Sequence, residues 1–179
     1  LNEGGVPLSD CAVLYRAHYV TRTLEEVFQK EKPPYVIYSG AQFFDRAEIK
    51  DALSYLRMAA FQDDLSFLRV VNRPKRNIGE RRVKHLSEYA KAHGCSLYDA
   101  LKAACEDELF KSTGARRFIA LTEHFSSLPP ETPVSELLSE LLDQSGYEHD
   151  LRTAGSQVRL DNLAELKQSI YEFETTCGE

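Results

Sequence analysis

The 179-residue sequence has no apolar run that approaches the roughly 20 residues needed to cross a bilayer. It also lacks an N-terminal signal pattern and any Asn-x-Ser/Thr glycosylation site. Four scattered cysteines form no Cys-x-x-Cys pair and have no histidine at ligand spacing, which disfavours a disulfide framework or a zinc site. These absences predict a cytoplasmic protein without membrane segments and without a metal site.

Nucleotide-binding and catalytic motifs are missing as well. No Gly-x-x-x-x-Gly-Lys-Ser/Thr loop occurs, and no glycine is followed by lysine, so a P-loop phosphate cradle is absent. No predicted strand ends in an acidic pair suited to Mg²⁺, and no catalytic triad is indicated. His93 and Cys95 are close in sequence but flank Gly94, a predicted helix end. The chain alone is predicted to hydrolyse no nucleotide and to bind no cofactor.

What the sequence does contain is ordinary globular composition with an uneven charge distribution. Hydrophobic residues make up 42% and charged residues 28%, enough for one good core. The net charge is −6, yet residues 69–85 hold seven cations and one acid. That segment is therefore +6, and the rest of the chain is −12. A basic stripe on an acidic body favours phosphate binding, with a solvated helix face as the alternative.

The first 40 residues predict an α/β unit. Residues 11–15 and 35–38 are short apolar runs typical of strands, and residues 21–31 between them predict a helix. Strand, helix and strand in this order indicate a parallel sheet. Two strands cannot satisfy the edges of a sheet, so we expect the other strands elsewhere in a longer chain, which the missing initiator Met also suggests.

After Gly40 only helices are predicted. Gly94 and Gly146 are expected at helix C-termini, and Ser96 and Thr132 at helix N-caps. In the first of these helices, Asp45 and Glu48 suggest a capping box, and Ile49 heads a predicted apolar face. Leu53 lies on that face, whereas Asp51 is expected on the opposite one. The predicted helices cover 46–60, 64–72, 80–93, 97–105, 112–127, 133–145 and 157–174.

Several of these segments resemble the UvrD/Rep/PcrA type of superfamily 1 ATP-dependent DNA helicase. Residues 12–16 with 21–26 are similar to helicase motif IV, which opens the second RecA-like lobe, 2A. Residues 34–51 resemble motif IVa, residues 67–79 the start of the helical 2B subdomain, and residues 158–166 the helix that returns to 2A. The implied fold is mainly α: a 2B-type subdomain attached to an incomplete RecA-like piece. Implied boundaries are 1–60, 61–160 and 161–179.

The resemblance also implies site residues. Arg16 matches the motif IV arginine that reaches the γ-phosphate of ATP, with ATP and Mg²⁺ bound by the rest of the helicase. Asn77 stands where relatives have glycine in a duplex-contacting loop, and His18 where they often have asparagine. The implied DNA-binding residues are Arg46, Arg73, Lys75, Arg76, Asn77, Ile78, Gly79, Arg81 and Arg82.

The sequence thus predicts part of a 3′–5′ DNA helicase whose partners are DNA, at the junction of single strand and duplex, and the remaining helicase domains. One alternative is a helical protein–protein interaction module that uses residues 69–85. The other is a nuclease-coupled relative of the same superfamily.

Overall fold

A computed structural model describes residues 7–15, 20–36 and 43–177. The chain divides into two compact units, Leu1–Arg46 and Ala47–Glu179. The first unit contains the 3₁₀ turn η2 (Leu8–Asp10), the helix α1 (Val20–Glu31) and the 3₁₀ turn η3 (Phe43–Asp45). Within this unit the buried Glu25 carboxylate of α1 accepts the backbone N–H of Phe43 at 3.0 Å. Burial raises the pKa of Glu25, and the bond fastens η3 to α1.

The α/β prediction for this unit is confirmed only for its helix. Residues 11–15 and 35–36 form no strand, and residues 37–38 lie outside the described part of the chain. A strand needs a neighbouring strand to pair with its N–H and C=O groups, and the described residues of this unit supply none. The mainly helical fold class is confirmed, whereas the RecA-like sheet and the predicted boundaries at 60 and 160 stay predictions.

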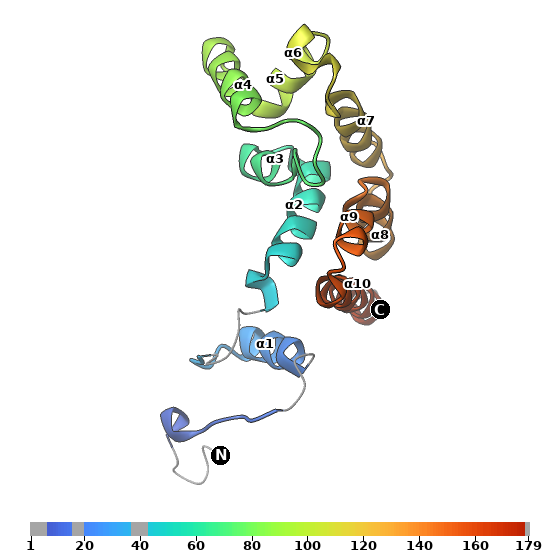
Figure 1. The fold of residues 1–179 in the computed structure, drawn as a ribbon. Coiled ribbons are helices and arrows are strands. Elements are labelled where there is room, and N and C mark those ends of the chain that lie inside the picture. Colours follow the sequence, from blue (N-terminus) through green and yellow to red (C-terminus); the bar gives the residue numbers. More distant parts are fainter. Residues whose placement is uncertain (1–6, 16–19, 37–42, 178–179) are drawn as a thin grey trace. The chain divides into compact units, whose positions relative to one another are not determined.

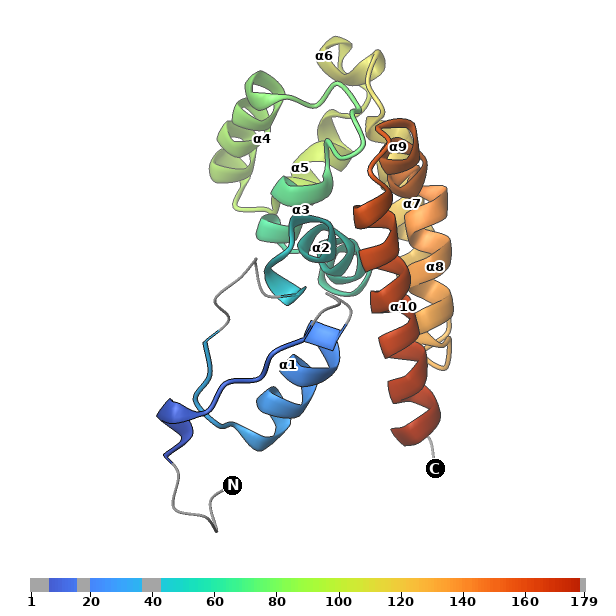
Figure 2. The same ribbon diagram turned by 60° about the horizontal axis from the view of Figure 1, so that its bottom comes forward.

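Every secondary-structure element in the described residues of the second unit is a helix (Figure 1). α2 (Ala47–Phe61) lies at its centre and contacts α3 (Asp64–Val70), α7 (Ala115–Ser126), α8 (Val134–Gln144) and α10 (Gln157–Cys177). α4 (Glu80–His93) pairs with α5 (Leu97–Ala104), and α5 also contacts α3 and α7. α6 (Glu108–Lys111) precedes α7, and α9 (Tyr147–Thr153) packs between α8 and α10. Figure 2 shows the long α10 running beside α8.

The core of this unit is aromatic and aliphatic. Its largest fully buried side chains include Tyr55, Phe67, Phe118 and Leu138. Phe67 of α3 meets Phe118 of α7 edge to face with ring centroids 6.0 Å apart, so these two helices share one packed layer around α2.

The predicted helices are confirmed with small shifts at their ends, but α6 and α9 were not predicted. With four and seven residues, both helices are too short to show a clear hydrophobic period. Gly94 and Gly146 are in the left-handed region as predicted, with φ of 64° and 79°. Ser96 caps α5 by accepting the N–H of Asp99 at 3.1 Å.

Two local predictions were wrong. α8 is not capped by Thr132; instead the Glu174 carboxylate of α10 accepts the N–H groups of Val134 and Ser135, because the tertiary fold brings an anion to that helix end. The buried face of α2 includes Asp51 and Tyr55, whereas Leu53 is only half-buried. Asp51 is buried because the fold surrounds it with hydrogen-bond donors, described below.

Candidate nucleic-acid interface

Internal hydrogen bonds fix the segment that links α3 to α4, residues 71–79. The Asn72 side-chain oxygen accepts the backbone N–H groups of Arg76 at 2.8 Å and Ile78 at 3.2 Å. The Ile78 side chain is fully buried and anchors the segment in the core. A short polar side chain that bonds backbone groups downstream is a common way to fix a turn. The segment is therefore a formed loop, not a loose connection.

Asn77, which stands where relatives have glycine, adopts a left-handed conformation in this loop. Its φ is 60°, in the left-handed region where asparagine is the best tolerated residue besides glycine. Gly79 is different: its φ is −84° and ψ −176°, an extended conformation open to any residue. A Cβ atom added to Gly79 would meet no atom within 4 Å. Glycine at position 79 is therefore not required by the backbone, although its exposed site leaves room for a ligand.

Arg76 lies inside the unit, with only 9% of its surface exposed. Its guanidinium is also 5.2 Å from the ring centroid of Phe118. The nitrogens donate to a ring of oxygens: the carbonyls of Val70 at 3.0 Å, Arg73 at 3.0 Å and Ser145 at 3.1 Å, and the hydroxyl of Tyr55 at 2.8 Å. The predicted phosphate contact by this side chain does not agree with that position, because its donors are used inside the protein.

The surroundings of Arg76 explain how a buried cation is tolerated without a carboxylate beside it. Val70 ends α3, and Ser145 is the C-cap of α8, so two helix C-termini meet at one guanidinium. The C-terminal carbonyls of a helix are unpaired within it and carry partial negative charge. Arginine suits the place because its planar fork offers five donors at fixed angles.

Arg82 also stabilises the loop by hydrogen bonds. Its Nε donates to the carbonyl of Leu109 at 2.7 Å, and its Nη1 donates to the carbonyl of Asn77 at 2.8 Å. The side chain thus joins α4 both to α6 and to the left-handed residue of the loop. Arg82 supports the shape of the loop, and its guanidinium is only partly accessible.

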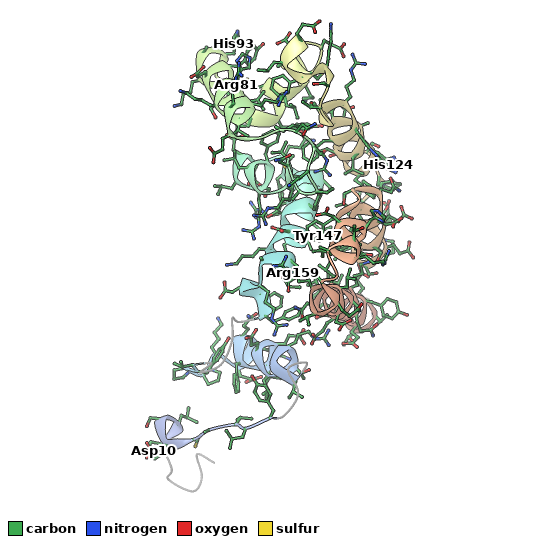
Figure 3. All side chains as sticks on the ribbon, viewed as in Figure 1. Asp10, Arg81, His93, His124, Tyr147 and Arg159 are labelled. Atoms are coloured by element: carbon green, nitrogen blue, oxygen red, sulfur yellow. The ribbon has the colours of Figure 1, made fainter. Side chains whose placement is uncertain are left out.

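Arg69 and Arg73 point to a buried carboxylate. Arg69 Nε lies 2.7 Å from one oxygen of Asp51, and Arg73 Nη1 lies 2.9 Å from the other. Tyr147 of α9, labelled in Figure 3, also donates its hydroxyl to Asp51 at 2.8 Å. Burial raises the pKa of Tyr147, and the bond to Asp51 raises it further, so the phenol keeps its proton. Arg73 remains 55% exposed, whereas Arg69 is largely covered.

The exposed residues left for a ligand are the cations Lys75, Arg81 and Lys84 and the uncharged Asn77 and Gly79; we call this set the Lys75–Lys84 face. Lys75 and Arg81 have no ion-pair partner among the described residues, and Lys84 is 4.0 Å from Glu88. Figure 3 shows Arg81 on α4. The loop and the start of α4 thus expose backbone groups and cations together, and the side chains of Asn72 and Arg82 fix the loop backbone.

Two further predicted site residues, Arg16 and Arg46, do not belong to this segment. Arg16 falls outside the described residues. Arg46 belongs to the first compact unit, where its guanidinium lies 5.3 Å from the ring centroid of Phe43. A DNA contact by Arg46 stays a prediction. No cluster of His, Cys, Asp and Glu in the described ranges could hold a metal ion, and no described helix is long and apolar enough to span a membrane.

Sequence reasoning missed two further nitrogen-bearing side chains near the loop, the cation Arg117 and the imidazole of His149. Arg117 of α7 and His149 of α9 line a hollow that Lys75 also lines. In the sequence, Arg117 lies in the predicted helix 112–127 and His149 in a segment with no predicted helix, and neither forms part of a short motif. Only the packing of α7 and α9 against the loop brings them to Lys75.

Known proteins resemble this chain over nearly its whole length. Residues 1–178 match the family model of the UvrD-like helicase C-terminal domain. The relatives include the ATP-dependent DNA helicases PcrA of Staphylococcus epidermidis and Staphylococcus aureus, each 37% identical over 96% of this chain. DNA helicase II of Haemophilus influenzae is 36% identical over the same share. The chain spans about a quarter (24%) of the length of these relatives. The resemblance expected from the sequence is confirmed: the chain belongs to the UvrD-like helicase C-terminal domain family.

Proposed function

We propose that this chain is the part of a cytoplasmic ATP-dependent DNA helicase that contacts duplex DNA beside the single-strand junction. Its relatives carry the name DNA helicase, and the chain matches about a quarter of their length. The proposed parent enzyme translocates 3′ to 5′ and couples ATP hydrolysis to unwinding. ATP and Mg²⁺ would be bound mainly by its other domains, since this sequence has no P-loop. Arg16, by resemblance to motif IV, would supply an arginine to the γ-phosphate.

The observation that carries the proposal is the separation of the cations in residues 69–85. Arg69 and Arg73 pair with Asp51, and Arg76 and Arg82 donate to backbone carbonyls. Lys75 of the loop and Arg81 at the start of α4 remain exposed beside these arginines. Exposed cations on a fixed backbone can bind phosphates without reading bases, as a helicase that unwinds any sequence requires.

The test is the salt dependence of binding to a fluorescent hairpin duplex with a single-stranded 3′ tail, measured by anisotropy. Each neutralised phosphate contributes about 0.9 to the slope of log K against log salt. We expect Lys75→Ala and Arg81→Ala each to reduce the slope by about 0.9, and the double variant by about 1.8. Hairpins of different sequence should bind equally.

Arg116→Ala is the matched control. Arg116 is exposed and carries the same charge, but it pairs with Glu106, so its removal should leave the slope unchanged. An unchanged slope in the Lys75/Arg81 double variant would place the duplex contact elsewhere. Absence of DNA binding at low salt would favour the protein–protein interaction module.

A further inference from the structure

A hollow of about 360 Å³ lies beside the Lys75–Lys84 face. Three turns meet there: residues 74–77 of the loop, Gly114 before α7, and the Ser145–Gly146 turn between α8 and α9. Its lining residues are Pro74, Lys75, Arg76, Asn77, Gly114, Arg117, Ser145, Gly146, His149 and Asp150. The hollow is therefore composed of segments that are far apart in the sequence.

Direct bonds fix the three turns to one another. The Gly114 N–H donates to the Arg76 carbonyl at 2.9 Å, and Arg76 Nη2 donates to the Ser145 carbonyl at 3.1 Å. A Cβ atom on Gly114 would lie 2.9 Å from the Arg76 Cβ, so only glycine lets the Arg76 side chain pass this point undisturbed. Arg76 thus joins all three turns, so bonds within the protein fix the walls of the hollow.

The charge of the hollow is positive. The cations Lys75 and Arg117 line it, with Asp150 as the one carboxylate of its lining. Arg117 is exposed and forms no ion pair with the described residues, whereas its neighbour Arg116 is bonded to Glu106. The Arg76 guanidinium adds a buried cation whose partners are carbonyl and hydroxyl oxygens instead of a carboxylate.

The lining also limits the kind of ligand. It contains no Phe, Tyr or Trp on which a nucleobase could stack, so a site for an unpaired base is disfavoured. Lysine and arginine side chains at an open, polar surface instead suit the phosphates of a nucleic-acid backbone. Lys75 belongs both to this hollow and to the Lys75–Lys84 face, so the two surfaces are continuous.

We propose that this hollow is a second phosphate site, in which Arg117 and Lys75 bind a backbone phosphate of the duplex next to the phosphates held by the Lys75–Lys84 face. The site rests on the proposed duplex-binding function and extends it from α4 to α7. Because Arg117 contacts only backbone, its contribution is independent of base sequence.

The test compares Arg117→Ala with Arg116→Ala in the 179-residue chain, using the same hairpin duplex. We expect Arg117→Ala to lower the salt slope by about 0.9 and Arg116→Ala to leave it unchanged. Arg117→Lys should restore the slope, because it keeps the charge. Both side chains are exposed, so both alanine variants should have the same urea midpoint as the wild type.

The outcomes separate the two proposals. If Arg117→Ala and Arg116→Ala both keep the salt slope of the wild type while Lys75→Ala and Arg81→Ala lower that slope, the hollow is not a phosphate site and the duplex-binding function stands. If Arg117→Ala changes binding to a single-stranded oligonucleotide but not to the hairpin, the assignment to duplex is overturned. If the wild type binds no DNA at low salt, both proposals fail.

Discussion

Replacing Arg76 by methionine tests the claim that this residue supports the interface from inside. Methionine fills a similar volume without donors, so the variant removes hydrogen bonds while leaving little cavity. The guanidinium donates to the carbonyls of Val70, Arg73 and Ser145 and to the hydroxyl of Tyr55. All four oxygens lose a charged donor in the variant.

The expected loss of stability follows from the other partners of these oxygens. The Val70 carbonyl also accepts the Arg73 N–H at 3.0 Å, and the Tyr55 hydroxyl also donates to the Arg73 carbonyl. For these three oxygens we take about 0.5–1 kcal/mol per lost bond. For the Ser145 carbonyl we take about 1 kcal/mol, the lower cost of an unsatisfied buried group. The sum is about 3 kcal/mol of unfolding free energy.

Urea denaturation followed by circular dichroism measures this loss. With a slope near 2 kcal/mol per molar urea, the midpoint should fall by about 1.5 M. Arg116→Met is the control for the same chemical change at an exposed site, and it should stay within about 0.5 kcal/mol of the wild type. Arg76→Lys keeps the charge but not the planar fork, so it should lie between the wild type and Arg76→Met. A loss below about 1 kcal/mol in Arg76→Met would refute the role that we assign to Arg76.

Two further predictions concern stability. Gly114→Ala should lower the free energy of unfolding by about 1–3 kcal/mol, since its Cβ would lie 2.9 Å from the Arg76 Cβ. Gly79→Ser, in open space, should change that free energy by less than about 0.5 kcal/mol, so equal urea midpoints for the two variants would contradict this packing. Glu174→Gln should cost about 0.5–1 kcal/mol at pH 7, because the carboxylate caps α8. The bond from the Ser135 hydroxyl, followed by those from backbone N–H groups, lowers the pKa of Glu174. This stabilisation is therefore present above the ordinary carboxyl pKa and is lost as pH falls through the lowered value. A difference in unfolding free energy between wild type and variant that persists well below that range would contradict the prediction.

Local signals in the sequence were sufficient for most helices and for several of their ends. Gly94 follows α4 in the left-handed conformation, and Ser96 caps α5, because both effects depend on residues within one turn. The capping of α8 by Glu174 could not be predicted in this way, since 40 residues separate that carboxylate from Val134. The same limit applies to the hollow, whose lining comes from three separate turns.

The basic segment shows why counting cations along a sequence overestimates a binding surface. Its seven cations were treated as one patch, yet four arginines bond to oxygens of the protein itself: Arg69, Arg73, Arg76 and Arg82. Both lysines of the segment and Arg81 are exposed, as is Arg73 despite its bond to Asp51. A weakly hydrated, planar guanidinium loses less on burial than an ammonium group and can bond several carbonyls at once. In a loop that carries both residue types, the lysines are therefore the better sequence-level candidates for ligand contact, and the arginines for support of the loop. The salt slopes of Lys75→Ala and Arg76→Lys test this division directly: the first should fall by about 0.9, and the second should not change.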